Sequence, residues 1–202
     1  FVRRQLRQQF PLLPVDLMRI PIFSMSIGTS ICSFTGQMLA MLSLPFFLQE
    51  TLKRSDVTTG LLLTPWPIAT MIIAPLAGRL VERIHAGILG SIGMTIFAIG
   101  LFLLAVLPSN PTNMDIIWRL FICGSGFGLF QTPNNSTIIS SAPSNRSGGA
   151  SGMLGTARLL GQTLGATQVA MIFYLVPINS SQTCLYSCLL YTSPSPRDRQ
   201  KS

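Results

Sequence analysis

The chain has 202 residues and a formal net charge of +8, yet only 10% of its residues are charged and 48% are apolar. A soluble domain carries about 25% charged residues, so this composition excludes an ordinary soluble domain. The apolar residues come in blocks long enough to cross a bilayer, which takes about 20 residues per helix. We therefore expect an all-α polytopic membrane protein, whose basic residues reflect its topology and not nucleic-acid binding.

Five apolar segments are expected to be transmembrane helices joined by short polar turns. Pro21 stands at a first helical position, where proline is favoured, and Pro177 closes the last segment. Residues 1–21 are expected to follow an earlier helix, and residues 22–176 to form the membrane bundle. The expected helices cover residues 22–48, 61–80, 86–107, 115–139 and 150–176.

The two ends predict a fragment of a longer protein. The chain begins at Phe1 and not at a methionine, and residues 177–202 are expected to be a truncated end. From about Cys188 the sequence CLLYTSPSPRD resembles one reading frame of a transposase sequencing adapter. A short basic tail that binds anionic lipid is the alternative.

Positive charge predicts the orientation of the bundle. Basic residues lie before the first span and in alternate connections, whereas Lys53 and Arg54 on the opposite side are balanced by Glu50 and Asp56. By the positive-inside rule the N-terminal segment is cytoplasmic, and we expect a multi-pass protein of a bacterial inner membrane. The basic residues of the cytoplasmic side are Arg3, Arg4, Arg7, Arg19, Arg79, Arg83 and Arg146.

Polar residues inside the spans are candidate cavity-lining residues, because a polar group in the bilayer usually faces a partner or a cavity. Gln131, Asn134 and Asn135 in the fourth span could instead cap the end of that helix. For Arg158 in the fifth span, snorkelling to the cytoplasm is the alternative. Arg119, about one turn into the fourth span, is expected to snorkel to the outer interface. The candidates for a cavity are Gln37, Gln131, Asn134, Asn135 and Arg158.

Glycines in the fourth and fifth spans are expected to pack helices. Small residues four apart let helix backbones approach closely. In the fifth span Gly148 and Gly152 form one such pair and Gly161 and Gly165 another. In the fourth span the glycines are Gly124, Gly126 and Gly128.

The residues of catalysis and metal binding are missing from the pattern. No paired acids, no Ser/His set and no H-E-x-x-H motif lie at membrane depth, and one histidine without a C-x-x-C pair cannot form a zinc site. We expect no enzyme, no catalytic residue, no metal and no cofactor. Every acid lies in a loop or at the end of a span and none in the middle of one, so a proton-coupling carboxylate is expected in the missing part of the chain.

The connection from Gly78 to Gly87 carries the charge pattern G-x-L-x-E-R between two apolar runs. It resembles the loop signature of the major facilitator superfamily, although His85 stands where a later glycine is expected. The resemblance implies a conformational latch formed by Gly78, Leu80, Glu82 and Arg83. Glu82 would cap the following helix or pair with a cation on a neighbouring helix, and a loop that merely fixes topology is the alternative.

Three further stretches, at residues 61–67, 124–134 and 146–152, are similar to the fourteen-helix drug:proton antiporter branch of that superfamily, the EmrB/QacA type, and to its SmvA-like members. The resemblance implies the C-terminal half of an exporter that works by alternating access, with the N-terminal half missing. It implies protons and drug-like cations, such as quaternary-ammonium compounds, as the transported species. A carrier of another small molecule, or a sensor or scaffold without transport, is the alternative.

Overall fold

The computed structural model describes residues 15–108 and 110–175, and these residues are almost entirely helical, with no strand among them. The expected all-α class is confirmed. The expectations for residues 1–14, and for the adapter-like end from Cys188, lie outside the described residues.

The expected first, third, fourth and fifth spans each begin within three residues of a helix in the structure. A 3-10 turn precedes the first helix, and a π-helical turn extends it. In chain order the elements are η1 (Val15–Arg19), α2 (Pro21–Phe46), η2 (Phe47–Thr51), α3 (Asp56–Leu63), α4 (Pro65–Val81), α5 (Ala86–Ala105), α6 (Asn113–Ser140), η3 (Ser144–Arg146) and α7 (Ser147–Leu175).

The second span begins at Asp56, earlier than the expected residue 61. Ser55 caps it by accepting a hydrogen bond from the backbone N–H of Thr58, which satisfies one of the free donors at the helix start. The span then divides at Thr64 into α3 and α4, because Pro65 has no N–H to continue the helical ladder.

Three segments are long and apolar enough to cross a membrane by length and composition: Pro21–Thr51, Asp56–Val81 and Ala86–Ala105. The helices α6 and α7 are 28 and 29 residues long, but glycines and polar side chains dilute their apolar character. Helices of this kind need neighbours in a bundle more than they need lipid.

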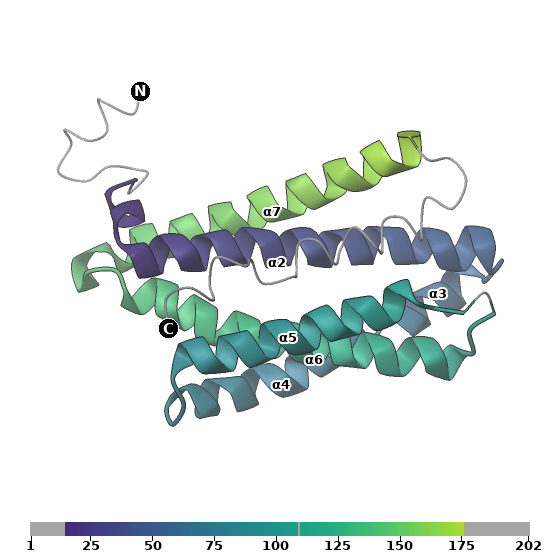
Figure 1. The fold of residues 1–202 in the computed structure, drawn as a ribbon, viewed down its shortest axis with the longest axis horizontal. Coiled ribbons are helices and arrows are strands. Elements are labelled where there is room, and N and C mark those ends of the chain that lie inside the picture. Colours follow the sequence, from purple (N-terminus) through teal and green to yellow (C-terminus); the bar gives the residue numbers. More distant parts are fainter. Residues whose placement is uncertain (1–14, 109, 176–202) are drawn as a thin grey trace.

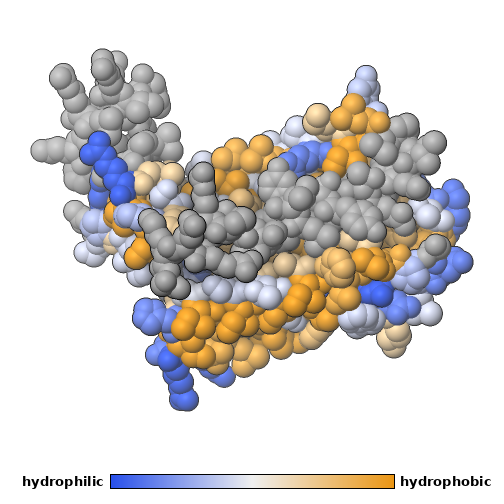
Figure 2. Space-filling model, in the orientation of Figure 1, coloured by the Kyte–Doolittle hydropathy of each residue, from blue (hydrophilic) through white to orange (hydrophobic). Residues whose placement is uncertain are grey.

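The helix α6 is the centre of the bundle and contacts α2, α4, α5 and α7. Figure 1 shows α2 and α7 running side by side on one side of α6, with α4 and α5 on the other. On the face drawn in Figure 2, an apolar band follows α5 and hydrophilic residues gather at the two ends of the bundle. The exposed side chains of α5 include Ile88, Ile92, Ile99 and Phe102, a surface suited to lipid.

An aromatic cluster joins four of the helices. The ring of Phe127 in α6 lies 5.5 Å from that of Phe34 in α2, 5.6 Å from Phe97 in α5 and 6.3 Å from Trp66 in α4, measured between centroids. These edge-on and tilted arrangements are the favoured ones for aromatic pairs. The cluster fixes the position of α6 against three neighbours.

Glycines mark the closest approaches between helices. A Cβ on Gly124 would overlap the backbone of Trp66 in α4, and one on Gly126 the backbone of Phe97 in α5. A Cβ on Gly161 or Gly165 in α7 would lie 2.6 Å and 2.7 Å, respectively, from carbonyl oxygens of α2. By contrast, Gly148 and Gly152 face open space, so that expected pair brings no helices together among the described residues.

Candidate functional site

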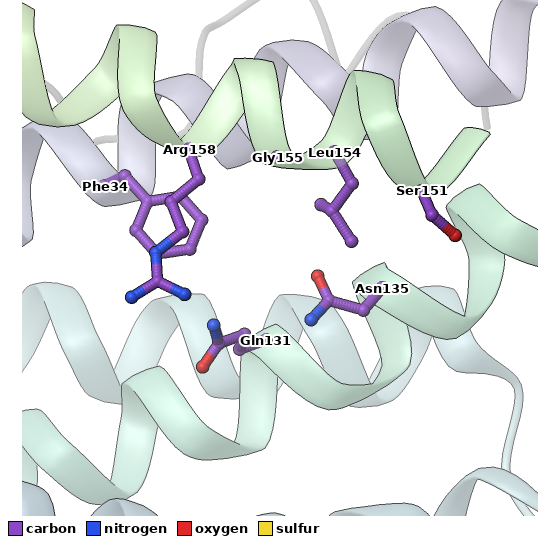
Figure 3. A pocket seen from close by; sticks show the side chains of 7 residues that line it. All are labelled: Phe34, Gln131, Asn135, Ser151, Leu154, Gly155 and Arg158. Carbon is purple, nitrogen blue, oxygen red and sulfur yellow. The ribbon is translucent and has the colours of Figure 1, made fainter. Parts of the chain in front are cut away.

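A pocket of about 220 Å³ lies between α2, α6 and α7 (Figure 3). That volume holds several water molecules but is smaller than a site for a whole drug-sized molecule, which takes about 300–1,000 Å³. The pocket is lined by Phe34, Gln131, Asn135, Ser151, Leu154, Gly155 and Arg158.

Helical periodicity places these residues in the pocket. Gln131 and Asn135 are four residues apart on α6, so their side chains share one face of the helix. On α7, Ser151, Leu154 and Arg158 follow the same i, i+3, i+7 pattern. In Figure 3 the side chains of Leu154 and Arg158 extend from α7 toward α6, and those of Gln131 and Asn135 face them.

The guanidinium of Arg158 packs against the ring of Phe34, with Cζ 5.5 Å from the ring centroid. Phe34 is itself held edge-on by Phe127, so the aromatic cluster supports this cation–π contact. Arg158 is eleven residues beyond the first residue of α7, or about 16 Å at ~1.5 Å per residue. It therefore lies about three helical turns into α7, because α7 begins at Ser147 and not at the expected residue 150.

Two amides and the guanidinium in the pocket have no hydrogen-bond partner among the described residues, whereas the Ser151 hydroxyl donates to the Ser147 carbonyl at 3.0 Å. Among the described residues, Gln131, Asn135 and Arg158 make no side-chain hydrogen bond or ion pair. No acid lines the pocket, so its fixed charge is the single positive charge of Arg158. At membrane depth such groups require water or a bound molecule.

The structure thus brings together three of the five candidate cavity residues and separates the other two. Asn134 turns away from the pocket: its Nδ2 donates to Ser30 Oγ in α2 at 2.6 Å and to the Ser26 carbonyl at 3.4 Å. It lies well inside α6, so it links helices and does not cap one. Gln37 is half-buried on α2 and does not line the pocket.

Three pocket residues carry no signal in the sequence that would have distinguished them. Phe34 reads as an ordinary apolar residue of a span, Leu154 as another, and Ser151 as a small polar residue near a helix start. Only the packing of α7 along α2 makes them neighbours of the candidate polar residues.

The second intramembrane arginine lies away from the pocket, beside Trp118, with Cζ 5.0 Å from the ring centroid. The Nε and Nη1 atoms of Arg119 are buried without a hydrogen-bond partner among the described residues. The expected snorkelling of Arg119 to the outer interface stays a prediction.

The loop expected to act as a latch joins α4 to α5 at one end of the bundle. Glu82 is the C-terminal cap residue of α4 and is exposed, whereas His85 stands at the N-cap of α5 and makes no side-chain capping bond. The expectation that Glu82 caps α5 is therefore wrong, because Glu82 ends α4 and the N-cap position of α5 is three residues further on, at His85. Leu80 and Arg83 are exposed as well, and a Cβ on Gly78 would find an ordinary contact with Thr132 at 3.8 Å.

A bundle of long apolar helices around a polar pocket defines an integral, multi-pass membrane protein. Among the described residues no group of three potential ligands is placed to hold a metal ion. The sequence model of the Major Facilitator Superfamily matches residues 3–166. The chain belongs to this superfamily of membrane transporters, and its fold is a partial major facilitator helical bundle.

Curated relatives include transporters and drug efflux proteins. The chain is 62% identical over 190 residues, 94% of its own length, to the uncharacterized transporter YebQ of Escherichia coli, of which it covers 42%. It is 31% identical to the multidrug resistance protein Stp of Mycobacterium tuberculosis, with 82% of this chain and 30% of Stp covered. It is also 31% identical to the multidrug efflux pump LfrA of Mycolicibacterium smegmatis, with 86% and 34% covered. The chain therefore spans less than half the length of these relatives.

Proposed function

We propose that the chain is part of a proton-coupled exporter of lipophilic and cationic drugs, such as quaternary-ammonium compounds, that works by alternating access. The observation that carries the proposal is the convergence of Gln131, Asn135 and Arg158 on one pocket of a transporter bundle, where none of the three makes a hydrogen bond or ion pair with a described residue. A structural core would satisfy or exclude such groups, whereas a transport pathway exposes them to water and substrate.

The similarity to multidrug proteins supports the drug-like substrate class. Stp and LfrA carry multidrug resistance and efflux in their names, and both align with more than four-fifths of this chain. We place the protein in the fourteen-helix drug:proton antiporter branch and in a bacterial inner membrane, with the α4–α5 and α6–α7 loops cytoplasmic. The charge distribution supports this orientation, since Arg79, Arg83 and Arg146 all lie at these loops.

The proton-coupling group belongs to the remainder of the protein. Within the described helices, Asp56, Glu82 and Asp115 all lie at helix ends and none faces the pocket. A carboxylate that moves protons across a membrane must lie within the pathway. We therefore propose that the N-terminal half supplies it.

The α4–α5 loop is proposed to act as a latch between the two halves. Glu82 and Arg83 are exposed at the end of the bundle, and Glu82 makes no ion pair among the described residues. An unpaired acid of this kind is free to pair with a cation of the other half in one state and to release it in another.

An efflux assay tests the proposed function. The full-length gene is expressed in a host without its own efflux pumps, and accumulation of a fluorescent quaternary-ammonium dye is followed with and without a protonophore. We expect expression to lower dye accumulation and the protonophore to restore it. If dye accumulation in expressing cells is unchanged, the proposal of drug efflux is rejected. If export continues in the presence of the protonophore, the proposal of proton coupling is rejected.

A further inference from the structure

The pocket between α2, α6 and α7 is rich in hydrogen-bond donors. A guanidinium presents five N–H groups in a planar fork, and each side-chain amide adds two more. Arg158, Gln131 and Asn135 direct these groups at one space from two helices (Figure 3). None of these N–H groups donates a hydrogen bond to another described side chain.

The position of the guanidinium is supported and not merely allowed. Its contact with Phe34 holds it at the wall of the pocket, and Phe34 is buried and packed against Phe127. A planar cation held in this way is preorganised to receive a carboxylate or carbonyl oxygen, because less side-chain entropy is lost on binding.

The charge and size of the pocket limit what can occupy it. With one positive charge and no acid in its lining, it repels the cationic end of a drug and attracts oxygen acceptors. At about 220 Å³ it holds one part of a drug-sized molecule. A cationic drug that also carries an oxygen acceptor would therefore place its ammonium group elsewhere in the pathway and that oxygen in this pocket.

We propose that this pocket is a subsite for the oxygen-acceptor group, carboxylate or carbonyl, of the transported molecule, bound by Arg158 together with Gln131 and Asn135. The assignment rests on the proposed transport function and names the part of the substrate that these helices recognise. Arg158 is then a specificity-determining residue: it favours molecules with an acceptor oxygen over purely cationic ones.

The test measures binding to the purified full-length transporter by isothermal titration calorimetry, with three naphthalene probes that share one ring system. The probes are 2-naphthoate, neutral 2-naphthamide and 2-naphthyltrimethylammonium, which has no oxygen. We expect Arg158→Gln to weaken naphthoate binding at least about tenfold, or ~1.4 kcal/mol, because a charge-assisted hydrogen bond is lost. Binding of the trimethylammonium probe should stay unchanged or improve.

Two further variants separate the subsite from general effects. Asn135→Ala should weaken naphthamide and naphthoate by a smaller factor and leave the ammonium probe alone. Arg19→Gln removes an arginine that is exposed in η1, away from the pocket, and should change the binding of no probe. Unfolding temperatures of all variants show whether a loss of binding reflects a loss of fold.

Transport and binding are measured on the same variants so that the two proposals fail separately. The subsite is rejected if wild-type protein binds neither oxygen-bearing probe, or if Arg158→Gln changes all three probes alike. It stands if the probes discriminate as expected while cells show no drug efflux, and in that case the proposed function fails alone. If efflux is sensitive to the protonophore but Arg158→Gln does not change probe selectivity, the proposed function is supported and the proposed subsite is rejected.

Discussion

Asn134 of α6 donates a hydrogen bond to Ser30 Oγ in α2 over 2.6 Å, while the next residue, Asn135, lines the pocket without a partner. Adjacent residues on a helix point about 100° apart, so two neighbouring amides serve two different surfaces. One amide holds α6 to α2, and the other is available to a ligand. This division predicts opposite results for the same substitution at the two positions.

Asn134→Ala is expected to destabilise the full-length transporter by about 1 kcal/mol, the usual net value of one hydrogen bond, because it leaves the buried Ser30 hydroxyl without its donor. Thermal unfolding followed by tryptophan fluorescence measures this. Asn135→Ala is the matched control and should leave the unfolding temperature unchanged. Equal loss in both variants would contradict the division of roles.

Gly126→Ala is expected to destabilise the bundle by about 1–3 kcal/mol, since the new methyl group would overlap the backbone of Phe97 and force α5 and α6 apart. Gly152→Ala is the matched control, with nothing within 4 Å of the added carbon. It should be neutral or slightly stabilising, because alanine is the better helix former. Detergent stability on size-exclusion chromatography compares the two, and a tolerated Gly126→Ala would mean that the helices are not packed as described.

Phe127→Ala is expected to cost about 3–5 kcal/mol, as for other large buried aromatic residues, because this ring joins Phe34, Trp66 and Phe97. Phe102→Ala removes the same atoms from an exposed position of α5 that faces outward. We expect Phe102→Ala to cost far less in detergent unfolding measurements. A similar loss at both positions would show that the aromatic cluster adds nothing beyond ring size.

Glu82→Ala in the full-length gene is expected to lower drug resistance at unchanged expression, because the latch loses its acid. Growth in the presence of a quaternary-ammonium biocide measures resistance, and immunoblotting of membranes measures expression. Glu50 is an exposed acid in η2, at the C-terminal end of the first span and not in the α4–α5 loop. Glu50→Ala is therefore the control and should retain resistance. Wild-type resistance of Glu82→Ala would reject the latch.

Helix positions could be predicted well because membrane helices are defined by length and apolar character. The second span shows where this fails: Asp56–Gly60 is polar, so hydropathy alone assigns it to a turn, whereas the Ser55 cap extends the helix through it. The expectation that Glu82 caps α5 fails for a similar reason, whereas its role in a latch stays a prediction. A charge pattern marks a loop, but it does not show at which residue the next helix begins.

The candidate polar residues were found because polar groups are rare in apolar spans, and Gln131, Asn135 and Arg158 needed only that rule. The rarity of polar residues in the spans could not show that Asn135 lines the pocket while Asn134 and Gln37 do not. Those outcomes depend on which face of each helix meets which neighbour.

The sequence by itself determined the class of protein, the number and order of its long helices and the residues whose polarity needs an explanation. These follow from local chemistry, since a bilayer requires apolar segments of a certain length. Only the tertiary structure decided that the guanidinium of Arg158 in α7 packs against Phe34 in α2. This contact places the guanidinium opposite the amides of Gln131 and Asn135 in α6. That contact joins residues 124 positions apart, and its geometry depends on close helix packing at Gly161 and Gly165.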